Sequence, residues 1–477
     1  MPLRFPESIG RARGVFCNRT LNLRAIKAIG YDMDYTLIHY HVDVWEGRAY
    51  EHARERLAAH GWAVGHLRFD PGLVSRALII DRHLGHVVKA DRFGNVRAAM
   101  HGTRMIDFPE LREIYARTVV DLRDTSRWEF LNTLFSLSVG CLYAQCVELL
   151  DEGKLPPAVG YRELYTAVQR ALDLTHIEGE LKAEIIKDPE RFVDRDPDLV
   201  VALRDQRDAG KKLLLITNSE WFYTDAMMGW YFGADWRALF DMVIVQARKP
   251  EFFLGSAPMY ALINEQGHLL PVTHHNRATT GQSFEAGLYY GGNAALVEQA
   301  LGLQGQDILY VGDHIFADVH ASKRTVRWRT TLVLREIEDD IAAIETLFDA
   351  EAKIAMLMRD KGELERGVAT LRLDLARRRH GREPLVAGSQ QEVESEIERL
   401  KAQLTSLDLL IAPLADEAAR HPHPRWGAIM RAGIDKSHLA RQIERYADTY
   451  TSRVSNFLWA TPSAYFRSPK SSLPHDA

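Results

Sequence analysis

The stretch Ile29-Gly30-Tyr31-Asp32-Met33-Asp34-Tyr35-Thr36-Leu37 decides how this chain folds. It follows a short apolar run, residues 25–29, that is typical of a buried strand. Asp32 and Asp34 are two residues apart, so on extended backbone their side chains point the same way. Open α/β sheets bind ligands at the carboxyl ends of their strands. The stretch therefore predicts an acidic pocket at a strand end, although a solvated turn would also explain this motif alone.

Two carboxylates this close are unfavourable unless a cation lies between them or one of them carries a proton. Phosphoryl transfer through an aspartyl-phosphate uses both arrangements. One carboxylate attacks phosphorus, the other handles the proton of the leaving group, and Mg²⁺ bridges the site. We therefore expect Asp32 and Asp34 to belong to a phosphoryl-transfer centre.

Three later segments repeat the pattern of an apolar run followed by polar residues. The second run ends in Thr217 and Asn218, whose hydroxyl and amide groups suit phosphate oxygens. The third ends at Lys249, which can act as a point charge on phosphate. The fourth carries Asp313 and, five residues on, Asp318, and a third carboxylate completes an oxygen site for a small hard cation. Separately these are features of turns, caps and solvated surfaces, but in this order they indicate a parallel α/β sheet.

The four segments resemble motifs I to IV of the haloacid-dehalogenase-like (HAD) phosphohydrolase superfamily. The resemblance is closer to one family within it, the cytosolic purine 5′-nucleotidases of the IMP/GMP-preferring type, and it covers about residues 15–468. It includes stretches outside the generic phosphatase motifs. The stretches that carry it are 32–37, 131–135, 247–253, 310–316 and 445–448.

The resemblance implies a role for each motif residue. Asp32 is the nucleophile, and Asp34 is the general acid for the ribose O5′ and then the base for the hydrolytic water. Thr217 and Lys249 hold the phosphoryl oxygens, and Asn218 is a secondary candidate for the same task.

The same motifs imply a Mg²⁺ site. Its ligands would be the carboxylates of Asp32 and Asp313 and the backbone carbonyl of Asp34. Asp318 has two expected roles that the sequence leaves open, since it could bind the metal through water or orient Lys249.

Base recognition is implied by the family's cap segment, in which an aromatic ring and a His sandwich the purine and a carboxylate and a Lys approach its edge. The matching positions are Phe135, Asp173, His176 and Lys182. Four residues before this Asp the family has Arg, whereas this chain has Gln169 followed by Arg170. A Lys or Arg donor favours 6-oxopurines, because IMP and GMP share an acceptor that AMP lacks. A surface role is the alternative for His176.

Vertebrate members of the family also carry a purine-nucleotide effector pocket near motif IV. Its positions fall on Asn132, Phe316, Arg324, Gln442 and Arg445. Arg324 replaces a Lys of the family, so the charge is retained. The alternative is that Arg324 lies on a solvated helix face and Phe316 belongs to the core.

Composition agrees with a large enzyme of more than one structural unit, because 477 residues exceed what one core usually holds. The net charge of −5 gives no sign of a nucleic-acid surface. We find no run of about 18 apolar residues and no signal-type apolar segment, so we expect neither a membrane span nor secretion. Three cysteines are too few for a disulfide framework, and a reducing cytoplasm is the expected location.

The order of the motifs predicts the domain organisation. About 185 residues separate Asp32 from Thr217, too many for one crossover, so a cap must be inserted after the first strand. Helical spacing of apolar residues recurs in 109–117, 128–150, 161–174 and 197–209. We expect a Rossmannoid core in 1–60 and 196–335, a mostly helical cap in 61–195, a helical hairpin in 336–420, and a C-terminal segment, 421–477, packed on the core.

The expected hairpin carries heptad stripes in 354–375 and 393–414, and Ser389 with Glu392 forms a capping box between them. The sequence leaves open whether it packs on its own core or on another subunit, and we expect a homo-oligomer.

The sequence thus predicts a Mg²⁺-dependent 5′-nucleotidase that acts on purine nucleoside monophosphates. A phosphatase of another metabolite, a nucleoside phosphotransferase and a non-catalytic scaffold are the alternatives.

Overall fold

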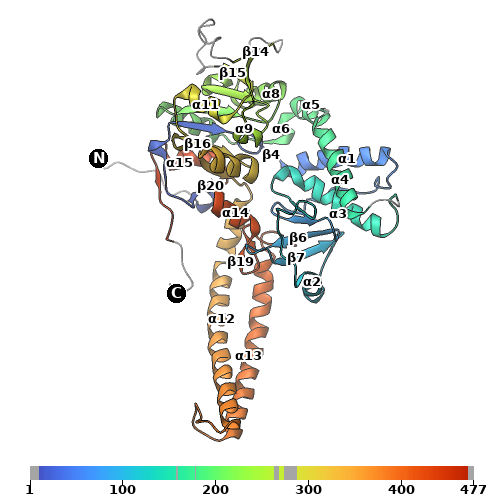
Figure 1. Cartoon of the computed structure of the whole chain (residues 1–477), viewed down its shortest axis with the longest axis vertical. Coiled ribbons are helices and arrows are strands. Elements are labelled where there is room, and N and C mark those ends of the chain that lie inside the picture. The colour runs from blue at the N-terminus through green and yellow to red at the C-terminus, as the bar shows by residue number, and fades with distance from the viewer. Residues whose placement is uncertain (1–9, 157–159, 178, 263–267, 273–286, 471–477) are drawn as a thin grey trace, which may run out of the picture. The chain divides into compact units, whose positions relative to one another are not determined.

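A large parallel sheet organises the core. The computed structural model describes residues 10–156, 160–177, 179–262, 268–272 and 287–470. Within these residues the largest sheet has ten strands in the order β1-β20-β17-β16-β3-β11-β12-β15-β13-β14 (Figure 1). In that order the strands are Val15–Cys17, Thr449–Thr451, Arg329–Val333, Ile308–Gly312, Ala28–Tyr31, Lys212–Ile216, Met242–Val245, Gly287–Gly291, Met259–Leu262 and Leu269–Pro271.

All pairings from β20 through β15 are parallel, and the outer pairings are antiparallel. β3, β12 and β16 are buried along their whole length, as expected of parallel strands that are covered on both faces. β3 lies between β16 and β11, so the segments that follow these strands meet at one edge of the sheet. The predicted α/β class and its parallel core are therefore confirmed.

Short helices alternate with these strands, as βα units require. They are α7 (Asp198–Asp208), α8 (Trp221–Phe232), α9 (Glu251–Leu254), α11 (Ala294–Leu301), α14 (His438–Tyr446) and α15 (Phe457–Ala460). A buried apolar cluster packs the sheet against α9 and α11, and its strand residues include Leu214, Ile244 and Tyr310.

The cap is inserted between β3 and β11, and it differs from the expectation in two ways. The sequence places residues 42–59 in the core, but α1 (Val42–Ala59) packs on α3 (Leu137–Asp151) and α4 (Tyr161–Ile177). The apolar face of α1 covers these helices, so the cap begins near residue 42. Its remaining helices are α2 (Phe108–Tyr115), α5 (Glu180–Lys187) and α6 (Pro189–Phe192).

The second difference is a five-stranded antiparallel sheet in the described part of the cap, with the order β8-β7-β6-β5-β9. The strands in this order are Arg104–Met105, Val96–His101, His86–Ala90, Ile79–Asp81 and Trp128–Phe130. The expected helix at 128–150 therefore starts later, because its first residues pair with β5. The β6 strand is buried at every position, so it lacks the alternation that marks a strand with one solvated face.

The two connections between core and cap lie side by side. β4 (His39–Tyr40) leaves the core, β10 (Val193–Asp194) returns to it, and the two pair in antiparallel register. Both connections are therefore fixed to each other at the border of the cap.

One described segment, Leu134–Asp151, is long and apolar enough to cross a membrane by length and composition. Two-thirds of it, 67%, is buried inside the protein, mostly as α3 against α1 and α4. Burial within the cap accounts for its apolar character.

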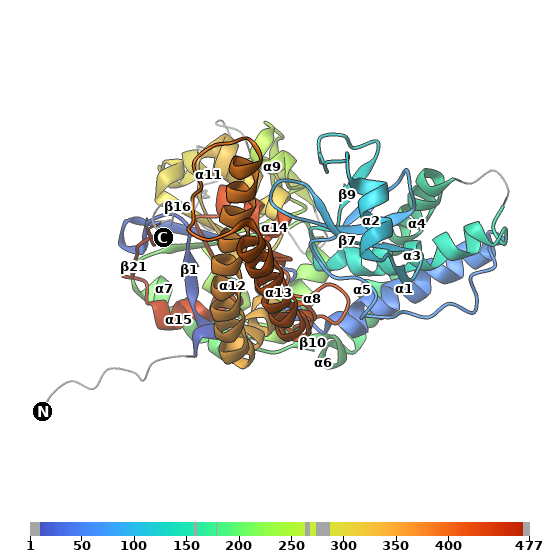
Figure 2. The same ribbon diagram turned by 90° about the horizontal axis from the view of Figure 1, so that it is seen from below.

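Residues 339–428 form a compact unit of their own. It consists of most of α12 (Ile337–Arg379) and of α13 (Gln390–Ala419), which run side by side (Figure 2). The seam between the helices is apolar, and the predicted capping box of Ser389 and Glu392 starts α13. The seam residues are Leu364, Val368, Leu371, Leu375, Val393, Ile397, Leu400 and Leu404.

Residues beyond 428 belong to the first unit. β20 pairs with β17 and β1 in the large sheet, and α14 packs on the helical turn Ile315–His320 that follows β16. The C-terminal segment therefore lies next to motif IV.

The seam of the hairpin can be tested with two leucines of α13. Leu400 is 8% exposed and Leu409 is 73% exposed. We expect Leu400→Ala to destabilise the hairpin by about 2–5 kcal/mol, because it leaves a cavity in the seam. Leu409→Ala should stay within about 0.5 kcal/mol of wild type. Urea unfolding followed by circular dichroism measures both, and equal losses would show that the seam is assigned wrongly.

Candidate active site

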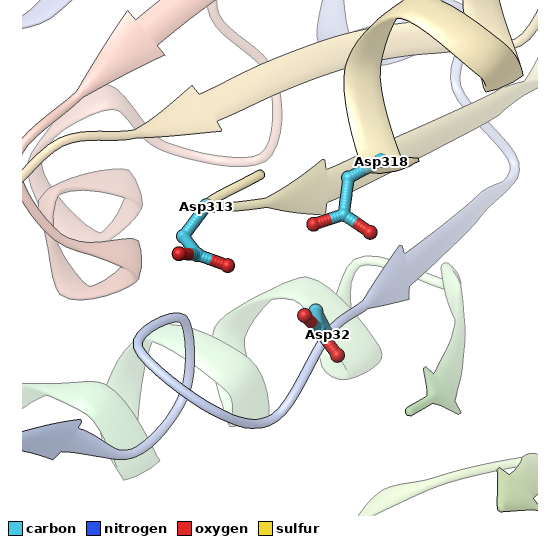
Figure 3. A group of neighbouring side chains, drawn as sticks. All are labelled: Asp32, Asp313 and Asp318. Carbon is cyan, nitrogen blue, oxygen red and sulfur yellow. The ribbon is translucent and has the colours of Figure 1, made fainter. Parts of the chain in front are cut away.

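Three carboxylates gather where the central strands end. Asp32 follows β3, Asp313 follows β16, and Asp318 lies on the helical turn after it. Among the described residues these are the ones whose ligand atoms form a group within 4.8 Å of one another, and they point toward a common centre (Figure 3). The donor set contains only oxygen and is largely buried, which fits a small hard divalent cation.

Lys249, from the loop after β12, lies among these carboxylates. Its Nζ is 2.7 Å from Asp32 Oδ1 and 2.8 Å from Asp318 Oδ1, and it donates to Tyr310 Oη at 2.9 Å. Asp318 therefore contacts Lys249 directly, as one of its two expected roles requires, and it also belongs to the carboxylate group.

Burial and crowding govern the charges of this group. Burial raises the pKa of Asp32 to about 7, and Lys249 opposes the rise. Burial would lower the pKa of Lys249, but Asp318 and Asp32 outweigh it and hold the pKa well above the usual range. Lys249 is therefore a cation, and it offsets part of the repulsion between its neighbours.

Asp34 has a different environment from Asp32. The Tyr40 hydroxyl donates to its Oδ1 at 2.6 Å, and the Ser219 hydroxyl donates to its Oδ2 at 2.6 Å. Tyr40 in turn shares a hydrogen bond of 2.9 Å with Tyr223. Each Asp34 oxygen keeps a second lone pair, so the carboxylate is oriented and can still exchange a proton. The sequence did not predict these three hydroxyls, and only Ser219, next to the Thr217-Asn218 pair, gave a local signal.

Thr217 and Asn218 both lie at the carboxyl end of β11, as expected. Thr217 is buried, and its Oγ1 accepts from the backbone N–H of Ser219 at 3.1 Å. The Asn218 amide is bound to the backbone of Lys249, with Nδ2 donating to its carbonyl at 3.2 Å and Oδ1 accepting from its N–H at 2.7 Å. Asn218 therefore joins the loops of motifs II and III, and because its amide has a second N–H donor, its role in phosphate binding stays a prediction.

Close packing at motif IV requires a glycine at position 312. A Cβ added there would lie 2.4 Å from Asp318 Oδ2. The same oxygen accepts from the backbone N–H of His314 at 3.0 Å. A larger residue would push Asp318 out of the carboxylate group.

Two of the four expected base residues lie beside the motifs. The Phe135 ring contacts Tyr35 at 4.7 Å and Trp45 at 5.5 Å between centroids. Lys182 pairs with Glu220 and lies 5.3 Å from the centre of the Tyr223 ring. Both residues thus approach the catalytic edge from the cap.

The hydrogen bond described for Asp173, a third expected base residue, lies within α4. Asp173 is exposed on α4 and accepts from Gln169 at 2.8 Å, so the residue that departs from the family pattern is its partner. His176 belongs to α4, but its side chain lies outside the described residues.

Three of the five expected effector residues, Phe316, Gln442 and Arg445, lie in or next to a series of aromatic contacts beside motif IV. Phe316 contacts Phe130 at 5.9 Å, and Phe130 contacts His438, which is bonded to Gln442 at 3.0 Å. Phe316 also contacts His320, His320 contacts Tyr446, and the Arg445 guanidinium lies over the Tyr446 ring. Arg324 is exposed, and the Asn132 carbonyl accepts from Nε of Arg76, another residue of the cap.

A buried carboxyl group that the sequence did not single out lies beside Phe135. Glu46 of α1 is 0% exposed. Its Oε2 accepts from the backbone N–H of Ser138 at 2.9 Å, and Oε1 has no hydrogen-bond partner among the described residues. Burial raises the pKa of Glu46 to about 7.

A parallel sheet that brings an aspartate pair, a hydroxyl, a lysine and two further aspartates to one edge has the groups of a phosphoric monoester hydrolase that works through an aspartyl-phosphate. A family model described as the 5′ nucleotidase family matches residues 15–477, and the chain belongs to that family. The expected family is therefore confirmed at the level of 5′-nucleotidases.

Two relatives illustrate the match. The chain is 26% identical over 480 residues to a 5′-nucleotidase domain-containing protein of Dictyostelium discoideum, covering 97% of this chain and 74% of the relative. It is 29% identical over 347 residues to 5′-nucleotidase domain-containing protein 2 of Rattus norvegicus, covering 70% of this chain and 61% of that protein. A HAD phosphatase of Thermococcus onnurineus aligns over 65% of this chain and 87% of its own, with 15% identity and a TM-score of 0.26.

Glu46 predicts a pH dependence of stability. A carboxyl group whose pKa is raised by folding contributes stability that is complete below its unfolded pKa of 4.5. That contribution is lost as pH rises toward and beyond about 7. Glu46→Gln removes this loss, so the variant should be more stable than wild type at pH 8 by roughly 1–3 kcal/mol. The difference should shrink as pH falls and vanish only below about pH 4.5, and urea unfolding across pH measures it. A constant difference at all pH values would contradict the assignment.

Proposed function

We propose that this protein is a Mg²⁺-dependent 5′-nucleotidase that hydrolyses purine nucleoside 5′-monophosphates, with IMP and GMP preferred, to nucleoside and phosphate. The observation that carries the proposal is the placement of Lys249 between Asp32 and Asp318, next to an Asp34 that two hydroxyls orient. In this proposal, one edge of the sheet supplies a nucleophile, a proton carrier and a phosphate-binding cation.

In the proposed reaction an Asp32 carboxylate oxygen attacks the 5′-phosphorus and the bond from phosphorus to O5′ breaks. Asp34 gives its proton to the departing O5′ and then takes a proton from the water that attacks the aspartyl-phosphate. That second attack releases phosphate and regenerates the Asp32 carboxylate. Thr217 and Lys249 hold the phosphoryl oxygens as charge spreads over them.

The cation site would hold Mg²⁺ through Asp32, Asp313 and the Asp34 carbonyl. When bound, Mg²⁺ would offset the charge of the carboxylates and of the phosphate. Asp318 contacts Lys249, which supports a role in orienting that lysine.

The cap would select the base. Phe135 would stack on the purine, and Lys182 would donate to the 6-oxo group that IMP and GMP share. Asp173 and His176 are proposed as base-binding residues from the family pattern. Because Gln169 stands where the family has Arg, the exact base preference is left to experiment. If a nucleoside instead of water attacked the aspartyl-phosphate, the phosphoryl group would pass to that nucleoside, which would be phosphotransfer.

We further propose a cytoplasmic homo-oligomer with no nucleic-acid or membrane partner. Among the described residues, Cys17, Cys141 and Cys146 form no disulfide, which suits a reducing compartment. Exposed Leu409 and Leu410 on the hairpin support contact between subunits. A nucleotide effector at the Phe316 and Arg445 cluster is proposed from the resemblance alone.

Phosphate release from a panel of nucleoside monophosphates tests the proposal. We expect IMP and GMP to exceed AMP and CMP, and excess EDTA to remove the activity. Asp32→Asn, which is nearly isosteric, should retain less than about 1% of wild-type turnover, because it removes the nucleophile. Better hydrolysis of CMP or of a sugar phosphate would refute the purine preference, and full activity in EDTA would refute the metal.

The Phe135 side chain distinguishes base stacking from core packing. Phe135→Ala should lower kcat/KM for IMP, with a loss of transition-state stabilisation of about 1–3 kcal/mol, the usual contribution of stacking on one base. p-Nitrophenyl phosphate does not reach the base pocket, so its hydrolysis should change little. Equal losses on both substrates would mean that Phe135 only supports Tyr35 and Trp45.

A further inference from the structure

A buried arginine of the cap reaches motif IV. Arg76 precedes β5 and is 2% exposed. Neither the motifs nor the expected base residues include it. Taking a guanidinium out of water is costly unless its donors are satisfied, so its partners indicate what it does.

These partners belong to three separate segments. Arg76 Nε donates to the Asn132 carbonyl at 3.0 Å, and Nη2 donates to the carbonyl of Asp313. Nη1 lies 3.6 Å from Glu336 Oε1. One planar group therefore joins a cap loop, the loop of a predicted metal ligand and the segment after β17.

The cap loop that Arg76 holds also touches Asp313 directly. Thr133 Oγ1 lies 3.5 Å from Asp313 Oδ2. The cap thus contacts both the peptide group and the carboxylate of this aspartate. Because the Asp313 carbonyl is held, the direction of its side chain into the carboxylate group is held as well.

We propose that Arg76 is a positioning residue for the divalent-cation site, and that it ties the seating of the cap to the placement of Asp313. The proposal rests on the proposed function in taking Mg²⁺ as the cation. If the proposal holds, the cation site reaches full affinity only while the cap loop 131–135, which carries Phe135, is in place. Cation binding and the position of the cap are then linked.

The charge and the shape of Arg76 make opposite predictions. A fixed positive charge beside a cation site repels Mg²⁺, so if charge alone mattered, its removal would strengthen binding. If the fork of donors positions Asp313, its loss weakens binding. Lys keeps the charge but has one ammonium group that does not reproduce two parallel donors at separate carbonyls.

Calorimetric titration with Mg²⁺ alone, without substrate, tests the proposal on the full chain. Arg76→Lys and Arg76→Gln should both weaken Mg²⁺ binding by about 10- to 100-fold, the usual cost of losing a group that orients a ligand. Arg82→Gln is the matched control, since Arg82 is a cap arginine that pairs with Glu129 at 3.8 Å, and it should match wild type. Melting temperatures and circular dichroism establish that each variant is folded.

A kinetic readout separates positioning from a loss of structure. In Arg76→Lys the Mg²⁺ concentration for half-maximal activity should rise for both IMP and p-nitrophenyl phosphate, while kcat at saturating Mg²⁺ recovers most of its wild-type value. Wild-type Mg²⁺ affinity in Arg76→Lys, or tighter binding in Arg76→Gln, would overturn the proposal. A wild-type protein that binds Mg²⁺ but cleaves no nucleotide would refute the proposed substrate and leave the Arg76 result to stand, whereas a wild type that binds no Mg²⁺ would overturn both.

Discussion

The crowding of three buried carboxylates around one lysine is the constraint on which the rest of the structure depends. Asp32, Asp313 and Asp318 hold ligand atoms within 4.8 Å of one another, where mutual repulsion and loss of hydration are both unfavourable. Lys249 offsets part of this cost. The parallel sheet is what makes the crowding geometrically feasible, because β3 and β16 are neighbours and end at the same edge.

Two aspartates that are two residues apart are separated chemically by their surroundings. Asp32 is buried against a cation, while both oxygens of Asp34 accept from hydroxyl groups. Different environments of this kind let neighbouring carboxylates take the separate roles of nucleophile and proton carrier. Tyr40 belongs to β4, so Asp34 is also in contact with the strand that leads into the cap.

The cap contributes to the core site at several points rather than merely covering it. Its loop 131–135 places an aromatic ring beside Tyr35 and a hydroxyl near Asp313. Its helix α5 places Lys182 against Glu220 at the start of α8. Since β4 and β10 pair where the chain enters and leaves the cap, these contacts are anchored close to the catalytic edge.

Much of the fold and of the catalytic group could be predicted from local sequence. Buried strands, the heptad seam and the capping box are short patterns that can be recognised in the sequence. Residue type and order predict the chemistry of Asp32, Thr217, Lys249 and Asp313. The cap sheet was missed because β6 is buried on both faces and so lacks the alternation of a strand. Only the tertiary structure decided that Ser219 orients Asp34 across 185 residues and that Arg76 reaches Asp313 across 237. Such contacts leave no local period in the chain, because they depend on how distant segments pack.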